Sequence, residues 1–120
     1  MNIKVGVIDD STVIQRSIKK LLGSTYDVFA ASSGYEGFRM ISEEKPDCII
    51  LDIEMDELSG LDVCRILRGS VESHDLPIII LSSNSGEFDL AKGLLVGADK
   101  YMVKPFTKEG LIEHIKSVLN

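Results

Sequence analysis

Five short apolar segments, separated by stretches of helical periodicity, constrain the fold of this 120-residue chain more than any other feature. They span residues 3–8, 27–31, 48–51, 78–81 and 101–103. The first, third and fourth are nearly continuous in Val, Ile and Leu rather than alternating with polar residues. Continuous apolar strands are typical of sheets that are covered on both faces. The sequence therefore predicts five strands in a buried, parallel sheet.

The intervals between these segments have the spacing of amphipathic helices. Four of them begin with residues that favour a helix start, namely Ser11 or Thr12, Ser33 with Glu36 three residues later, Ser59 with Asp62, and Thr107. The second helix must close before Pro46. A further helix, from Glu87 to about Val96, is expected to be the weakest and most mobile, because three glycines lie in or beside it.

Strand and helix alternate five times, with crossovers of ten or more residues and no hairpin signals. Such alternation predicts right-handed βαβ units and an α/β fold in which helices cover both faces of a doubly wound parallel sheet. No linker, repeat or charge block interrupts the pattern. We therefore expect residues 1–120 to form one domain.

The charge balance argues against nucleic acid or an anionic membrane as a direct partner. The chain has 19 acidic and 13 basic residues, for a formal net charge of −6, which suits phosphate backbones poorly. It also lacks an apolar stretch of membrane-spanning length and the apolar core of a signal peptide, so a cytoplasmic location is expected.

Cys48 and Cys64 lack CxxC spacing and are predicted to be buried free thiols.

Polar residues follow the predicted strands where the carboxyl ends of a parallel sheet bind ligands. Asp9 and Asp10 follow the first strand, Asp52 the third, Ser82 the fourth and Lys104 the fifth. Three clustered carboxylates repel one another unless a cation joins them, and oxygen ligands suit Mg²⁺. Lys104 and Ser82 could bind a phosphate, and an aspartate could accept a phosphoryl group as an acyl phosphate.

Each of these residues, taken alone, also has an ordinary structural role. Asp9 and Asp10 could cap the first helix, Asp52 could begin a turn, and Lys104 could be a solvated surface lysine. The two serines after the fourth strand could cap the fourth helix. The functional interpretation is favoured because four strand ends bring complementary groups to the same edge of the sheet.

Four segments of the sequence resemble the signature segments of CheY-like receiver domains of two-component signalling. They are VIDDS (7–11), IILDIEM (49–55), ILSS (80–83) and GADKYMVKPF (97–106). The resemblance extends from the first strand to the last helix. It implies a five-stranded sheet in the order 2-1-3-4-5 with five helices, and a signalling switch controlled by phosphorylation.

The resemblance also implies a phosphoacceptor and a metal site. Asp52 would accept the phosphoryl group. Asp10, Asp52 and the main-chain carbonyl of Glu54 would bind Mg²⁺ directly, and Asp9 would bind it through water. Glu54 and Asn84, each two residues beyond a site residue, would flank the path of the attacking water and tune the lifetime of the phosphoryl group.

Further roles implied by the resemblance concern the response to phosphorylation. Ser82 would donate a hydrogen bond to the phosphoryl group, and Lys104 would pair with it, with a cis peptide bond to Pro105. Tyr101 corresponds to an aromatic switch residue that turns inward when the serine moves. The altered surface would comprise the fourth helix, the fifth strand and the fifth helix.

By the same resemblance, the phosphodonor would be a histidine kinase or a phosphotransfer protein, and the output would be a contact with a downstream protein rather than enzymatic turnover. Residues 81–111 are most similar to receivers of chemotaxis-type systems that control type IV pili and twitching motility. The chain could be a free-standing receiver or part of a longer regulator. Which of these applies stays open.

One position departs from the family pattern: Asp56 occupies the place after Met55 where most receivers have proline, which puts loop rigidity and metal affinity in question. The sequence fits three other classes of protein less well. A haloacid-dehalogenase-type phosphatase would need a second aspartate at Glu54. In a flavodoxin-like electron carrier, Asp9 and Asp10 would repel the flavin phosphate. A dinucleotide-binding module would need a glycine-rich motif, which this sequence lacks.

Overall fold

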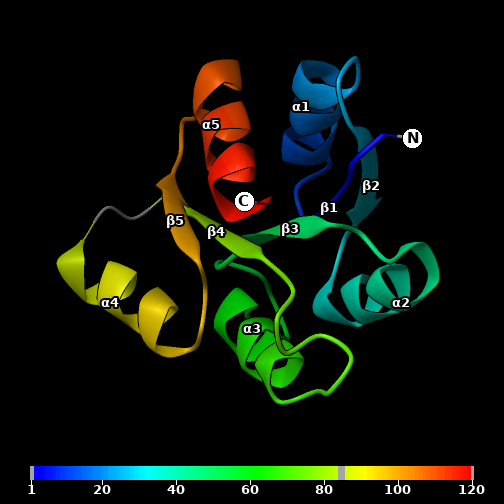
Figure 1. Ribbon diagram of the computed structural model, residues 1–120. Coiled ribbons are helices and arrows are strands. Elements are labelled where there is room, and N and C mark those ends of the chain that lie inside the picture. The colour runs from blue at the N-terminus through cyan, green and yellow to red at the C-terminus, as the bar shows by residue number, and fades with distance from the viewer. Residues whose placement is uncertain (1, 84–85, 120) are drawn as a thin grey trace.

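The computed structural model of the chain describes residues 2–83 and 86–119. Strands and helices alternate throughout (Figure 1). The strands are β1 (Lys4–Ile8), β2 (Asp27–Ala31), β3 (Cys48–Asp52), β4 (Ile78–Ser82) and β5 (Lys100–Val103). The helices are α1 (Thr12–Leu22), α2 (Gly34–Glu44), α3 (Gly60–Arg68), α4 (Glu87–Leu95) and α5 (Lys108–Leu119). Each expected element is present, and the strand bounds lie within one residue of the predicted segments.

The strands form one parallel sheet in the order β2-β1-β3-β4-β5, which confirms the predicted fold class. Every residue of β3 and β4 is buried, whereas β2 and β5, at the edges, include exposed residues. This difference explains why the third and fourth apolar segments are continuous, since a central strand covered on both faces has no position that faces water.

Helices cover both faces of the sheet: α1 and α5 lie on one face, and α2, α3 and α4 lie on the other (Figure 1). The core is divided accordingly. Ile18 of α1 and Leu111 and Ile115 of α5 pack against one face of the central strands. Met40 of α2 and Val63 of α3 pack against the other. The helices therefore leave the two ends of the sheet, rather than its faces, for polar groups.

Predicted capping residues begin four of the helices. The side chains of Ser11, Ser33 and Ser59 accept hydrogen bonds from main-chain N–H groups three residues later, and Thr107 accepts one from Gly110. Gly86 is the residue before α4, and it provides no side-chain cap. The alternative role of Ser82 and Ser83 as caps of this helix is therefore wrong.

Arg68, which no sequence pattern indicated, joins two loops at the C-terminal end of α3, the loop before β4 and the loop before β5. Its Nε donates to the carbonyl of Gly97 at 2.8 Å, and its Nη1 donates to the carbonyl of Leu76 at 2.7 Å. Its Nη2 donates to Asp99 at 2.9 Å, and Asp99 in turn accepts from the main-chain N–H of Ile78 at 2.8 Å. This network fixes the segments that enter β4 and β5.

Candidate functional site

The carboxyl ends of three strands place acidic and basic side chains in one cluster, as the sequence predicts. Asp9 and Asp10 follow β1, Asp52 is the last residue of β3, and Lys104 follows β5. Carboxylate oxygens of the three aspartates lie within 4.8 Å of one another. We call these three residues the acidic cluster. They come together because β1 and β3 are neighbours that run in the same direction.

Asp9 is a buried residue of the acidic cluster with one carboxylate oxygen that accepts no hydrogen bond from the described residues. It is 1% exposed, and its Oδ1 accepts a hydrogen bond of 2.9 Å from the main-chain N–H of Ser11. Its Oδ2 is buried without a hydrogen-bond partner among the described residues. Nζ of Lys104 lies 3.7 Å from Oδ2. A buried carboxylate oxygen without a hydrogen-bond partner is costly, so this oxygen is available to a cation.

Asp52 shares Lys104 with Asp9. Its Oδ1 is 3.4 Å from Nζ of Lys104 and accepts a hydrogen bond of 3.2 Å from the main-chain N–H of Glu54. Burial, together with the negative charge of Asp9, raises the pKa of Asp52 to about 6, although the Glu54 N–H and Lys104 oppose this rise. In the absence of a metal, one positive charge therefore does not neutralise the two buried carboxylates.

The residues present fit a divalent cation. Asp9, Asp10 and Asp52 offer hard oxygen ligands within reach of one ion, and the buried Oδ2 of Asp9 lacks a donor among the described residues. Asp10 is exposed, so one side of the cluster faces water. Mg²⁺ prefers a few carboxylates with waters in its remaining positions. The acidic cluster could thus hold a metal of this kind.

The side chain of Glu54 makes contacts that the sequence did not predict. Oε1 of Glu54 accepts hydrogen bonds from the hydroxyl of Ser82, from the main-chain N–H of Ser83 and from the hydroxyl of Ser83, each at 2.8 Å. These bonds lower the pKa of Glu54, the Ser83 N–H having the largest effect. We call the Ser82 hydroxyl, the Ser83 main-chain N–H and the Ser83 hydroxyl the β4 donors. The sequence places Ser83 at the end of the fourth strand but predicts no functional role for it.

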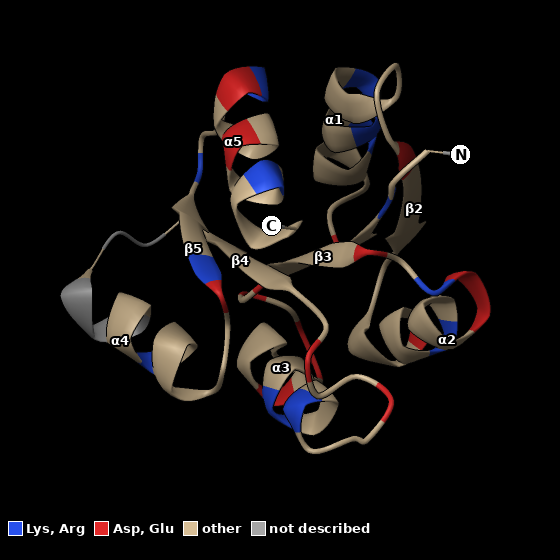
Figure 2. Ribbon diagram, in the orientation of Figure 1, with Lys and Arg blue, Asp and Glu red and all other residues tan. Residues whose placement is uncertain are grey.

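The loop that joins β3 to α3 is strongly acidic (Figure 2). Asp56 and Glu57 are exposed there, and Glu57 has a left-handed conformation with φ 61°. Gly60 ends the loop, and its main-chain N–H donates to the carbonyl of Ile53 at 3.2 Å. The tight loop thus returns to the end of β3, beside Asp52.

Gln15 of α1 is a positioning residue that sequence reasoning missed. Its Nε2 donates to the carbonyls of Asp9 at 2.7 Å and Ala31 at 3.3 Å, and to the hydroxyl of Ser32 at 3.0 Å. It therefore ties the loop after β1, which presents the acidic cluster, to the end of β2. A glutamine in the first turn of a helix is too common to signal this role.

The other predicted site residues have these positions. Tyr101 is partly buried in β5 and packs against the core on the α2 and α3 side of the sheet. The peptide bond between Lys104 and Pro105 is cis, as the resemblance implies. Asn84 lies outside the described residues.

The two cysteines are remote from this chemistry. Cys48 and Cys64 are free, and both are fully buried, as predicted. Burial raises the pKa of the Cys48 thiol to about 12. Both thiols therefore belong to the core.

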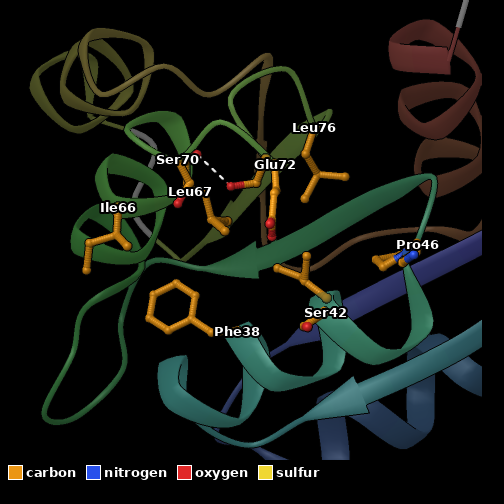
Figure 3. Close-up of a pocket in the computed structure, with 11 residues that line it drawn as sticks. Phe38, Ser42, Pro46, Ile66, Leu67, Ser70, Glu72 and Leu76 are labelled. Carbon is orange, nitrogen blue, oxygen red and sulfur yellow. Dashed lines mark hydrogen bonds between the residues drawn. The ribbon is translucent and has the colours of Figure 1, made fainter.

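A separate groove of about 840 Å³ lies between α2 and the segment from α3 to the start of β4 (Figure 3). Phe38, Ile66 and Leu76 give it an apolar lining, and Ser42 and Glu72 add polar groups. None of the acidic cluster, Lys104 or the β4 donors lines it. The chemistry of the chain is therefore not in this groove.

No helix within residues 2–83 and 86–119 combines the length and the apolar character that a bilayer crossing requires.

The sequence profile of the response regulator receiver domain matches residues 5–116. Protein PilG of Pseudomonas aeruginosa is 40% identical over 116 residues, which cover 96% of this chain and 86% of PilG. Response regulator MprA of Mycobacterium tuberculosis is 37% identical over 120 residues, which cover 99% of this chain and 51% of MprA. The chain therefore spans most of the length of PilG and about half that of MprA.

Solved structures agree with these relatives. The chemotaxis protein CheY4 of Vibrio cholerae has a TM-score of 0.93 to this chain at 28% identity, and the match covers 99% of this chain and 100% of CheY4. A receiver domain protein of Clostridium thermocellum has a TM-score of 0.89 at 32% identity, covering 98% and 94% of the two chains. With its CheY-like fold and its acidic cluster, the chain belongs to the response regulator receiver domain family, whose members are signalling domains rather than classical enzymes.

Proposed function

We propose that the chain is a phosphorylation-dependent signalling switch in which Asp52 accepts a phosphoryl group. The observation that carries this proposal is the position of Asp52, which is buried among the acidic cluster with Nζ of Lys104 3.4 Å from its carboxylate. A carboxylate in this setting is held at a fixed place beside positive charge. Phosphoryl transfer depends mainly on such positioning and charge neutralisation.

The phosphodonor would be a phosphohistidine of a histidine kinase or of a phosphotransfer protein. An oxygen of the Asp52 carboxylate attacks phosphorus, the bond between phosphorus and the imidazole nitrogen breaks, and the electron pair of that bond stays on the imidazole. The product is an acyl phosphate on Asp52. Hydrolysis of this acyl phosphate releases inorganic phosphate and resets the switch.

The residues of the site would bind the metal and compensate the charge of the phosphoryl group. Asp10, Asp52 and the main-chain carbonyl of Glu54 would hold Mg²⁺ directly and Asp9 would hold it through water. When bound, the metal supplies positive charge for the transferred oxygens. Lys104 would pair with the phosphoryl group and so compensate its added charge.

The response would pass from Ser82 to Tyr101. We propose that the hydroxyl of Ser82 donates a hydrogen bond to the phosphoryl group and that the Tyr101 ring then turns inward. This movement would change the surface of α4, β5 and α5. Glu54 and Asn84 would set the lifetime of the acyl phosphate. The orientation of the Tyr101 ring, compared with and without the phosphate mimic beryllofluoride, tests this step, and a ring that does not move would contradict it.

The partner in the output step would be a protein. Residues 1–120 would act as one receiver domain in the cytoplasm, without direct contact to nucleic acid or membrane. The net charge of −6 supports this view. The similarity to PilG and to the chemotaxis protein CheY4 supports a role in a chemosensory pathway that controls motility or pili.

Incubation with acetyl phosphate and Mg²⁺, followed by intact mass measurement, tests the proposed function. The native chain is expected to gain the mass of one phosphoryl group, and the gain is expected to disappear when Mg²⁺ is chelated. The Asp52→Ala variant is expected to show no gain. Labelling that persists in this variant would refute Asp52 as the acceptor.

A further inference from the structure

The contact between Glu54 and the end of β4 is built like an anion-binding site. Two hydroxyls and one main-chain N–H converge on Oε1 of Glu54 at 2.8 Å, and the hydroxyl of Ser83 also lies 2.8 Å from Oε2. Hydrogen bonds to a carboxylate are stronger than those between neutral groups. A glutamate carboxylate is ionised near neutral pH, so the group that occupies the β4 donors there is an anion.

A phosphoryl group has the same requirements. Its oxygens carry negative charge and accept hydrogen bonds from hydroxyl and main-chain N–H donors. The proposed function assigns one of the β4 donors, the Ser82 hydroxyl, to the phosphoryl group on Asp52. In the unphosphorylated chain, this hydroxyl donates to Glu54 instead. The two anions therefore compete for one donor, because a hydroxyl has one proton to donate.

Glu54 and Asp52 are also connected through the backbone. Glu54 is two residues after Asp52, and its main-chain N–H donates to Oδ1 of Asp52 at 3.2 Å. The main-chain N–H of Ile53 donates to the carbonyl of Leu81 at 3.1 Å, which holds this short loop against the end of β4. The negatively charged phosphoryl group on Asp52 would repel the Glu54 carboxylate at short range. Because Glu54 is exposed, its side chain can leave toward solvent.

We propose that the Glu54 carboxylate is an internal competitor of the phosphoryl group: it occupies the β4 donors while Asp52 is unmodified and must leave them for Ser82 to respond. This inference rests on the proposed function and concerns the same site. It assigns Glu54 a role in holding the inactive arrangement, in addition to any effect on hydrolysis. Removal of the carboxylate frees the β4 donors and favours the phosphorylated arrangement.

Binding of beryllofluoride to the Mg²⁺-loaded chain, followed by fluorine NMR, separates this role from hydrolysis because no acyl phosphate is broken. The Glu54→Gln variant keeps the shape of the side chain and loses the charge, and Glu54→Ala removes the side chain. Both are expected to bind beryllofluoride about tenfold more tightly than the native chain, the ratio that corresponds to loss of about one charged hydrogen bond.

Glu57→Gln is the matched control, because it removes the same charge from the same loop three residues away. It is expected to change beryllofluoride affinity by less than about twofold, as an exposed charge is screened by water and salt. In a Ser82→Ala background, the gain from Glu54→Gln is expected to shrink, because the two side chains are coupled.

The outcomes separate the two proposals. If the native chain binds beryllofluoride and both Glu54 variants bind it equally or more weakly, the internal competitor is refuted and the proposed function stands. An equal gain in Glu57→Gln would also refute the competitor, because the effect would then be general charge. If the native chain and every variant fail to bind beryllofluoride with Mg²⁺ present, the proposed function itself fails.

Discussion

Asp52 combines near-complete burial with a neighbouring carboxylate, and this combination makes it a source of instability until a cation arrives. Its pKa is raised from 3.8 to about 6, first by burial and then by Asp9. Between these two values, the folded state holds the Asp52 proton more tightly than the unfolded state does. The free energy of unfolding therefore falls as pH rises through this window, and the full penalty is present above pH 6.

Replacement of Asp52 by asparagine is expected to stabilise the metal-free chain. About two pKa units at about 1.4 kcal/mol each give a gain of up to about 3 kcal/mol near pH 7, and this net shift already includes the attraction to Lys104. Urea unfolding with EDTA measures it. The gain is expected to vanish as pH falls toward 4. Asp75→Asn, an exposed aspartate in the loop before β4, is the control. A less stable Asp52→Asn chain near pH 7 would contradict this reasoning.

The cysteines test burial directly. Cys48 and Cys64 have no exposed surface, and burial raises the pKa of both thiols, so neither the thiol nor the reactive thiolate is accessible. The native chain is expected to react slowly with an aromatic disulfide reagent near pH 8, whereas the chain unfolded in guanidinium reacts at both thiols. Rapid reaction of two thiols in the native chain would show that the core is more open than described.

Among the elements, the joint between β3 and α3 is the tightest part of the site. A Cβ at Gly60 would overlap the main-chain carbonyl oxygen of Asp52 and lie 2.6 Å from the Cα of Ile53. These are backbone atoms, which cannot move aside as a flexible side chain can. Close approach of α3 to the end of β3 thus requires glycine at position 60.

Gly60→Ala is therefore expected to lower the free energy of unfolding by about 1–3 kcal/mol and to weaken Mg²⁺ binding, because the backbone of Asp52 must shift. Gly69→Ala, at the other end of α3, is the matched control. There a Cβ would lie 3.6 Å from the carbonyl oxygens of Arg65 and Ile66, which is an ordinary contact, and the stability should change by less than about 0.5 kcal/mol. Calorimetric titration and urea unfolding measure both effects. Equal behaviour of the two variants would contradict this view of the joint.

Over the whole molecule, the sheet is what made the acidic cluster predictable. The order and direction of the strands follow from apolar segments that alternate with helices, and parallel strands bring their carboxyl ends to one edge. Asp9, Asp10, Asp52 and Lys104 could be placed together from their position after a strand alone. The roles of these residues, by contrast, come from the resemblance and stay predictions.

What could not be predicted depends on side-chain orientation in loops. The carboxylate of Glu54 reaches Ser82 and Ser83, and the guanidinium of Arg68 reaches two loop segments. Neither contact has a periodic or spacing signal, because each joins residues that are far apart in sequence and meet only after the sheet has formed. The pattern of apolar residues in the sequence does not predict such contacts.

Binding of Mg²⁺ is expected to stabilise the whole fold, since the acidic cluster joins the ends of β1 and β3 at the centre of the sheet. A ligand that binds only the folded state at 100 times its dissociation constant adds about 2.7 kcal/mol to the free energy of unfolding. Thermal unfolding with increasing Mg²⁺ measures the effect. Asp10→Asn is expected to reduce it, and Asp75→Asn is expected to leave it unchanged. A midpoint that does not respond to Mg²⁺ would contradict the metal site.

The most direct measurement of the central claim identifies the phosphorylated residue itself. Borohydride reduces an acyl phosphate to an alcohol, so a phosphorylated aspartate becomes homoserine while free carboxylates remain unchanged. After treatment with acetyl phosphate and Mg²⁺, borohydride reduction and peptide mass spectrometry, homoserine is expected at position 52 and nowhere else. Homoserine at Asp9 or Asp10, or a gain of phosphoryl mass without homoserine at position 52, would contradict the claim that Asp52 is the phosphoacceptor.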